Sequence, residues 1–200
     1  MIAKLKPYLF ALSLVPLLYL AVELYRNDLG ANPVEEITHA TGEWTLRFLM
    51  ATLVITPLRR TFGWSDLIKY RKMFGLYAFF YGFVHLMIWL GLDKNFSVAE
   101  MWKDTVKRPF ITAGMLGFVL MIPLAVTSTN WWIRKLKKNW ATLHKLIYAT
   151  CVAGVVHYLF LVKSDIEEPL MYGGCFLFLF VWRYFSTDLG RWVKTRYARS

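Results

Sequence analysis

The chain has 200 residues, 57% of them apolar, and its 24 Lys and Arg against 13 Asp and Glu give a net charge of +11. Soluble domains are less apolar and more charged, and disordered chains need low hydrophobicity, so both classes are disfavoured. A nucleic-acid-binding domain this apolar would be unusual, and a membrane protein with basic cytoplasmic loops fits better. Cys151 and Cys175 lie in apolar runs and indicate neither a disulfide framework nor a thiolate metal site.

Six apolar segments follow one another along the chain, and each approaches the roughly 20 helical residues that cross a bilayer. The first follows a basic stretch but lacks a small-residue cleavage site, so it is expected to remain as an uncleaved helix. The sequence therefore predicts an all-α bundle of six transmembrane helices that forms one domain over residues 1–200. The predicted spans cover about 8–25, 42–58, 73–92, 110–127, 142–162 and 170–186.

The loops between these segments differ in charge. Those on the side of both termini carry 17 Lys and Arg and two acids, whereas those on the other side carry six Lys and Arg and ten acids. The positive-inside rule places both termini in the cytoplasm. The loops are too short for a soluble domain, and the sequence shows neither a glycine-rich nucleotide-binding motif nor an internal repeat. Any activity is therefore expected inside the membrane or through a partner.

Three of the four histidines lie within predicted spans, where ionisable groups are costly and usually functional. At about 1.5 Å per residue, His85 lies about 18 Å and His157 about 24 Å from the cytoplasmic side, on different helices. Two neutral imidazoles at similar depth suit a haem iron, whereas no Cys, Asp or Glu joins them for a zinc site. Gly82 and Gly154, each three residues before a histidine, clear space for a flat macrocycle. Hydrogen-bonded packing histidines are the alternative.

A third intramembrane histidine, His144, lies 13 residues before His157, near the cytoplasmic face. Side chains 13 residues apart on an ideal helix point about 140° apart, so a bend or π-bulge is needed to aim both at one channel. Arg71 precedes His85 by 14 residues, nearly in phase with it, and shares the depth of His144. Arg71 is therefore either part of a second site or a cation that reaches the interface or a propionate.

Several strings carry a resemblance to a known family. They are Ile37 to Gly42 (ITHATG), Leu46 to Arg59 (LRFLMATLVITPLR), Arg71 to His85 (RKMFGLYAFFYGFVH), Arg108-Pro109, and the stretch from Leu143 to Leu159. With them the chain resembles the ferric-reductase-type transmembrane family, whose members carry two haems between histidine pairs on two helices. Within that family it is most similar to the haem-binding membrane subunits of periplasmic methionine-sulfoxide reductase systems.

The resemblance implies cofactors and their ligands. His85 and His157 would ligate an outer haem b, and His144 would ligate an inner one. The family's fourth histidine falls near Arg71, so Arg71 would take part in binding the inner cofactor. One or two haems b are therefore expected, with FMN as a further cofactor for which the sequence shows no motif.

The resemblance also implies partners and a location. Electrons would come from the quinone pool or a cytoplasmic flavin reductase and cross the bacterial inner membrane. They would reach a periplasmic molybdopterin-containing reductase that repairs methionine sulfoxide, so the chain would be an electron-transfer subunit rather than the catalytic one. A small proton channel or transporter that uses His85 and His157 as a relay without haem is the alternative. A haem-free assembly subunit is a third interpretation.

Other residues have open assignments. His39 falls in an acidic outer loop and is expected as a solvated residue or helix cap, with partner contact or quinol proton acceptance as the functional alternative. Arg47 is expected to pair with Glu43 one turn earlier or to reach the outer haem's propionates. Close helix-packing points are expected at Gly114, Gly117 and Gly173-Gly174.

Overall fold

The computed structural model describes residues 5–162 and 164–197, with side chains up to Ser186, and all regular structure there is helical. The all-α prediction is confirmed. The helices are α1 (Lys6–Leu12), α2 (Val15–Arg26), α3 (Pro33–Phe62), α4 (Ile68–Ile88), α5 (Val98–Lys107), α6 (Pro109–Val126), α7 (Asn130–Leu136), α8 (Lys138–Leu143), α9 (Leu146–Leu161) and α10 (Glu167–Tyr197). A 3-10 turn at Ser65–Leu67 precedes α4 and a π turn at Trp89–Asp93 follows it.

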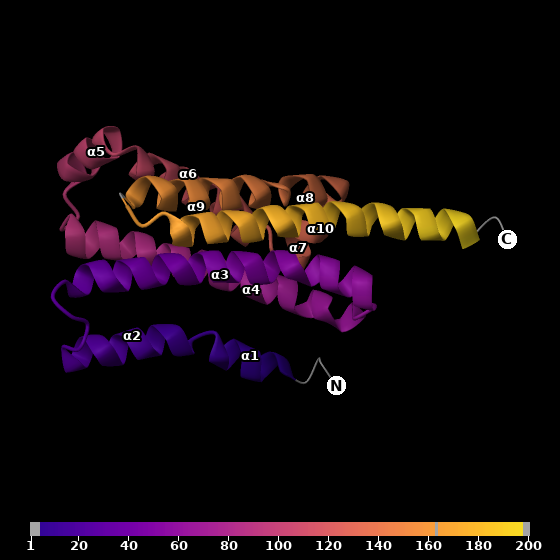
Figure 1. Ribbon diagram of the computed structural model, residues 1–200, viewed down its shortest axis with the longest axis horizontal. Coiled ribbons are helices and arrows are strands. Elements are labelled where there is room, and N and C mark those ends of the chain that lie inside the picture. The colour runs from indigo at the N-terminus through magenta and orange to yellow at the C-terminus, as the bar shows by residue number, and fades with distance from the viewer. Residues whose placement is uncertain (1–4, 163, 198–200) are drawn as a thin grey trace.

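The long helices run side by side along the longest axis of the molecule (Figure 1). α1 begins and α10 ends at the same end of this bundle, called the terminal end below. The opposite end, where α3 and α6 begin, is called the rim end. The chain thus crosses the bundle an even number of times between its first and last helix, as the charge pattern of the loops requires.

Four helical stretches of the described chain are long and apolar enough to cross a membrane: Lys6–Arg26, Ser65–Asp93, Pro109–Val126 and Lys138–Leu161. They coincide with the first, third, fourth and fifth predicted spans. α3, with 30 residues, and α10, with 31, have the length to cross as well. α3 is less apolar because Glu43 and Arg47 interrupt it.

The first span is a helix interrupted near its middle, directly before Pro16, which has no N–H to continue the ladder. Two tyrosines of α4 bind the backbone at this break. Tyr77 donates its hydroxyl to the Phe10 carbonyl at 2.7 Å, and Tyr81 donates to the Ser13 carbonyl at 2.9 Å. A carbonyl left without a donor in an apolar environment is costly, so these contacts fix the first span against α4.

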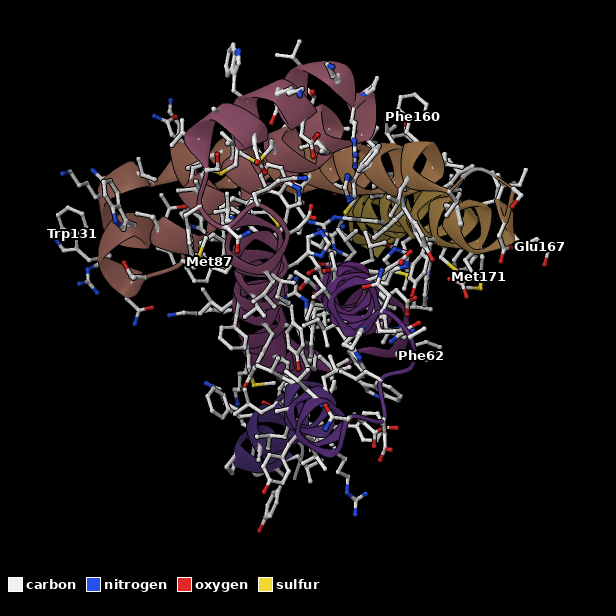
Figure 2. The ribbon with its side chains drawn as sticks, turned by 90° about the vertical axis from the view of Figure 1, so that its left-hand side faces the viewer. Phe62, Met87, Trp131, Phe160, Glu167 and Met171 are labelled. Carbon is white, nitrogen blue, oxygen red and sulfur yellow. The ribbon has the colours of Figure 1, made fainter. Side chains whose placement is uncertain are left out.

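Two helical hairpins form the centre of the bundle. α3 packs against α4 along its length, α6 packs against α9 in the same way, and α10 lies against both α3 and α9. Phe48 fills the core between α3 and α4, with its ring centroid 5.3 Å from that of Tyr77 and 5.2 Å from that of Tyr81. Figure 2, viewed from the rim end, shows Phe160 and Met171 pointing away from the bundle, as expected of lipid-facing side chains.

The helix that contains the second predicted span begins before that span. α3 begins at Pro33, nine residues before the predicted start at 42, with Asn32 as its cap accepting from the Glu35 N–H at 3.4 Å. Asparagine before the first turn, proline at its first position and two acids within it are all helix-start signals. Hydropathy alone missed them because this turn is polar. The prediction that His39 lies in a loop is therefore wrong, since His39 is inside α3.

The fifth predicted span contains a bend, which the spacing of its histidines required if His144 and His157 were to face one channel. α8 ends at Leu143 and α9 begins at Leu146, with His144 at the turn between them.

The glycines predicted to be close helix-packing points have different surroundings. Gly117 and Gly173 both lie at helix contacts, because a Cβ at Gly117 would lie 3.4 Å from that of Ala153 and one at Gly173 would lie 3.4 Å from a methyl group of Val155 on α9. Gly174 faces open space, so its assignment as a packing point is wrong.

The connection between α4 and α6 is folded rather than extended. It contains α5, whose Val98, Trp102 and Val106 are exposed on one face. Lys94 holds α5 to the end of α4 through an ion pair of 2.6 Å with Asp104, and both side chains are largely buried. The Lys94 ammonium keeps the pKa of the Asp104 carboxyl below its usual value, and Asp104 raises the pKa of Lys94 in turn.

Candidate functional site

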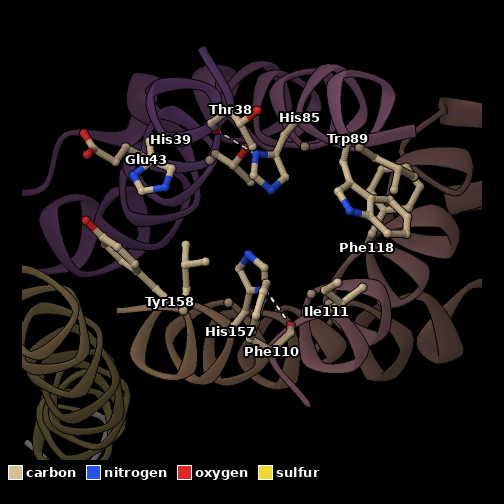
Figure 3. Close-up of a pocket in the computed structure, with 18 of the residues that line it drawn as sticks. Thr38, His39, Glu43, His85, Trp89, Phe110, Ile111, Phe118, His157 and Tyr158 are labelled. Atoms are coloured by element: carbon tan, nitrogen blue, oxygen red, sulfur yellow. Dashed lines mark hydrogen bonds between the residues drawn. The ribbon is translucent and has the colours of Figure 1, made fainter. Parts of the chain in front are cut away.

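His85 on α4 and His157 on α9 face each other across a cavity of about 590 Å³ enclosed by α3, α4, α6 and α9 (Figure 3). Their ring centroids lie 5.9 Å apart, and the ring planes are nearly perpendicular at 88°. The structure thus brings these two residues together at one level of the bundle. Cofactor sites commonly enclose about 300–1,000 Å³, so the cavity has the size for one.

Each histidine is held by a backbone carbonyl. The Nδ1 of His85 lies 2.9 Å from the oxygen of Thr38, and the Nδ1 of His157 lies 2.6 Å from the oxygen of Phe110. A carbonyl oxygen can only accept, so both Nδ1 atoms carry the hydrogen. Both Nε2 atoms therefore keep a lone pair, which is the form of imidazole that binds a metal.

Two glycines allow the histidines to sit this close to the neighbouring helices. A Cβ at Gly42 on α3 would lie 3.1 Å from Cε1 of His85. A Cβ at Gly114 on α6 would lie 2.7 Å from Nδ1 of His157, closer than real Cβ contacts come. The prediction that Gly114 serves helix packing is corrected here, because its neighbour is the His157 ring. Gly82 and Gly154, three residues before the histidines, line the cavity as expected.

These parts recur at a fixed spacing. The residue giving the carbonyl precedes its histidine by 47 positions in both hairpins. Gly114, Gly154 and His157 each lie 72 residues after Gly42, Gly82 and His85. The hairpins α3–α4 and α6–α9 are therefore two versions of one histidine-bearing unit. The prediction of no internal repeat is wrong at this level, because the repeat survives in only a few identical residues.

The cavity walls change character along its length. Toward the terminal end they are apolar, formed by residues such as Leu46, Leu49, Met115, Phe118 and Met121. Toward the rim end they carry a polar rim, which consists of Asn32, Glu35, His39, Glu43, Asp93, Arg108 and Tyr158. Figure 3 shows His39 and Glu43 beside Tyr158 on one side of the paired histidines, with Trp89, Phe118 and Ile111 on the other. The sequence alone did not place His39 in this cavity.

Arg47 pairs with Glu43 at 2.5 Å, as the one-turn spacing predicted, and its guanidinium also lies 4.8 Å above the Trp44 ring. It does not line the cavity. Of the two open assignments for Arg47, the structure therefore favours the intrahelical ion pair.

His144 lies toward the terminal end in a different environment. Its Nε2 is 2.9 Å from the hydroxyl of Thr127, and its ring stacks on Trp140 with centroids 4.0 Å apart. Trp140 itself donates to the Thr127 carbonyl at 2.9 Å. Arg71 lies within electrostatic reach of His144, as the shared depth predicted, but among the described residues the two form no hydrogen bond with each other. Arg71 and His144 therefore lie at the same end of the bundle without direct contact through a hydrogen bond.

The described residues contain no group of three or more His, Cys, Asp or Glu side chains that could hold a metal ion. His85 and His157 instead form a pair of facing imidazoles. Such a set suits a metal whose remaining ligands come from a macrocycle, as in haem, better than a zinc ion that takes four ligands from the protein.

Comparison with known proteins identifies the family. The ferric reductase like transmembrane component family matches residues 41–155. The protein-methionine-sulfoxide reductase heme-binding subunit MsrQ of Xanthomonas oryzae pv. oryzae is 44% identical over 197 residues, which cover 96% of this chain and 90% of the relative. The chain belongs to the MsrQ family. MsrQ proteins of Caulobacter vibrioides and Rhodospirillum rubrum are each 46% identical, covering 84% and 82% of this chain and 80% of either relative. No solved structure matches.

Membership of the MsrQ family confirms the resemblance that the sequence strings carried. The parts of the site that sequence reasoning missed are Gly42, Gly114 and the two carbonyl groups. A glycine followed by a histidine 43 residues later occurs at Gly42 and again at Gly114, and this signal could have revealed both hairpins. The carbonyl groups have no sequence signal, because every residue carries one.

Proposed function

We propose that this MsrQ-family chain binds haem b between His85 and His157 and carries electrons across a membrane for a methionine-sulfoxide reductase. The observation that carries the proposal is the facing pair of imidazoles, each held by a carbonyl through Nδ1 with Nε2 directed into one cavity. The relatives are heme-binding subunits by name, which supports the same cofactor here.

The residues present fit a haem. The two ligands come from different helices and leave a gap between their rings, while the apolar walls suit a macrocycle and the polar rim suits its charged edge. Gly42, Gly82, Gly114 and Gly154 keep side chains out of the space beside the histidines. A bound haem would supply a reversible one-electron carrier. The protein's part is to orient both imidazoles, to exclude water with the apolar wall, and to set ligand basicity through the Nδ1–H bonds.

A second haem at His144 and Arg71 stays a prediction from the resemblance. It would require the Nε2 of His144 to leave the Thr127 hydroxyl. FMN, expected from the resemblance alone, has no counterpart in the names of the relatives, and the proposal includes haem only.

The proposed location is the bacterial inner membrane, with α3 and α10 added to the four candidate spans to give six. Both termini would lie in the cytoplasm, because the terminal end carries most of the Lys and Arg residues. The cavity would then open toward the periplasm. The proposed acceptor is a periplasmic molybdopterin-containing reductase subunit, and the proposed donor is quinol or a cytoplasmic flavin reductase.

The alternative is a proton relay through His85 and His157 without haem. Both histidines donate to backbone carbonyls through Nδ1, and neither carbonyl can pass a proton onward. This fixed arrangement favours ligation over relay.

The experiment that tests the proposal is a spectrum of the full chain purified in mild detergent after expression with adequate haem supply. Dithionite-reduced minus oxidised absorption should show sharp low-spin b-type bands, and pyridine haemochrome quantification should give at least one haem per chain. Proton flux into liposomes should not exceed that of empty vesicles. A colourless protein that conducts protons would overturn the proposal in favour of the relay.

A further inference from the structure

The polar rim contains three carboxylates, and each already has a partner. Glu43 pairs with Arg47 at 2.5 Å, and Asp93 pairs with Lys94 at 3.0 Å. Glu35 accepts from the side chain of Asn32 at 2.8 Å. The acidic charge of the rim is therefore largely matched from within the protein.

The hydroxyl of Tyr158, also on the rim, is occupied as well, because it donates to Glu168 at the start of α10. Neither the Tyr158 hydroxyl nor the three carboxylates can therefore donate a hydrogen bond to a ligand that enters the cavity.

The two basic side chains of the rim, Arg108 and His39, keep N–H donors available. The nearest acid to Arg108 is Asp104, 3.6 Å from its Nε, whereas Lys94 lies 2.6 Å from the same carboxylate. Lys94 is thus the main partner of Asp104, in keeping with the lowered pKa of that carboxyl. The Arg108 side chain is 54% exposed, and among the described residues its guanidinium makes no hydrogen bond.

His39, on α3, is half-buried and also lines the cavity, and its ring makes no hydrogen bond within the described part of the chain. It lines the same cavity as both paired histidines (Figure 3). An imidazole on a cavity wall that is not engaged by the protein can donate to a ligand.

The backbone sets these two donors at comparable places. Arg108 lies two residues before Phe110, whose carbonyl holds His157, and His39 follows Thr38, whose carbonyl holds His85. Each donor therefore sits beside the anchor of one ligand, and the two approach the cavity from different hairpins. A ligand bound between the histidines would present its rim-end edge to both.

We propose that Arg108 and His39 bind the two carboxylates of the ligand, the propionates of a haem, and so fix its orientation with the propionate edge at the rim. The inference rests on the proposed function, because it assumes a haem between His85 and His157. Guanidinium is the best partner for a carboxylate, and an imidazole N–H gives the second a single hydrogen bond. The apolar edge of the haem would then lie toward Leu49 and Met121.

The test compares haem with haem dimethyl ester, in which both propionates are blocked. Apoprotein expressed under haem limitation is loaded with either form, and the rate of haem loss to excess apomyoglobin is followed by absorbance. The variants are Arg108→Gln and His39→Gln, with Lys103→Gln on α5 as a matched control that removes an exposed cation outside the cavity.

For haem, Arg108→Gln should raise the rate of haem loss about tenfold, because a hydrogen bond from a charged donor is lost. His39→Gln should raise it about threefold, because the hydrogen bond lost there is weaker. For the dimethyl ester, both variants should match the parent within about twofold. Arg108→Lys keeps the charge and should fall between parent and Arg108→Gln, and its unchanged low-spin spectrum reports that the fold is intact.

Equal effects of a variant on haem and on its ester would overturn the inference while leaving the proposed function in place. If the parent chain binds neither form, the proposed function itself fails.

Discussion

The two hairpins that meet at the cavity are alike where they hold the histidines and unlike at the polar rim. In each, the first helix gives a carbonyl and a glycine, and the second gives a glycine and a histidine at the same spacing. The residues that follow each carbonyl differ, with His39 and Glu43 after Thr38 but Ile111 and Met115 after Phe110. The likeness suits binding of one metal by a histidine from each hairpin. The difference suits a ligand whose edges differ, because the two cavity walls then offer different side chains.

The likeness also ends along the length of the hairpins. The residue 72 positions before His144 is Lys72, so only the second hairpin has a histidine at that level. A second site at the terminal end cannot be built from two equivalent ligands. If such a site exists, it would depend on Arg71 and on His144, whose ring contacts Thr127 and Trp140.

The largest expected effect is loss of either paired histidine. His85→Ala and His157→Ala should reduce haem at this site equally, to below about a tenth of the parent, because even outer-shell changes cost 10–100-fold in metal affinity. Haemochrome quantification per chain checks this. Tyr77→Phe is the matched control, since it removes a buried carbonyl contact from the same helix as His85 without touching the cavity. Full haem in either alanine variant would disprove that histidine's role.

The next effect separates the two hairpins. Gly114→Ala should weaken haem binding and destabilise the fold by about 1–3 kcal/mol, because its Cβ would lie 2.7 Å from His157 and the ring must move. Gly42→Ala should act in the same direction but less, since its closest contact with His85 is 3.1 Å. Thermal unfolding and haem retention measure both.

Gly174→Ala, with nothing within 4 Å of its added Cβ, is the control for these two and should behave as the parent. If Gly42→Ala proves more damaging than Gly114→Ala, the assignment of the tighter contact is wrong.

A smaller effect on the site between the hairpins is expected from His144→Ala. It should leave the haem between His85 and His157 in place, with its reduced spectrum and midpoint potential nearly unchanged, because the ring packs on Trp140 and Thr127 outside the cavity. A spectroelectrochemical titration checks this. If a second haem is present in the parent, the haem-to-protein ratio falls by one. Loss of all pigment would show that the two levels are a single unit.

The smallest effect concerns α5, which joins the hairpins at the rim end. The pKa of Asp104 is lowered from 3.8, so its ion pair is present above that value and lost as pH falls through the lowered pKa. The pKa of Lys94 is raised from 10.5, so its contribution is lost only as pH rises above that value. Hydrogen-exchange protection of α5, corrected for intrinsic rates, should be flat from about pH 5 to about pH 9.

Asp104→Asn should lower the hydrogen-exchange protection of α5 across that whole range. A titration step in the parent near pH 7 would contradict the assignment of Lys94 as the partner of Asp104.

Much of this architecture could be predicted because a helix that crosses a membrane needs a long run of apolar residues, and such a run is visible in the sequence. Apolar segments gave all of the long helices, and histidines inside them gave the pair His85 and His157. The start of α3 was missed because its first turns are polar, and His39 was misplaced as a result. The roles of Gly42 and Gly114 depend on which residue of a neighbouring helix lies against them. The spacing of residues along the chain does not predict this.

The most direct test of the central claim, that His85 and His157 hold one haem between them, uses the double variant His144→Ala/Arg71→Ala. This chain keeps only the site between the two hairpins, and it is examined by haem quantification and by low-temperature electron paramagnetic resonance of the oxidised form. The account predicts one low-spin haem per chain with two imidazole ligands. A haem-free protein, or a single high-spin haem, would contradict it.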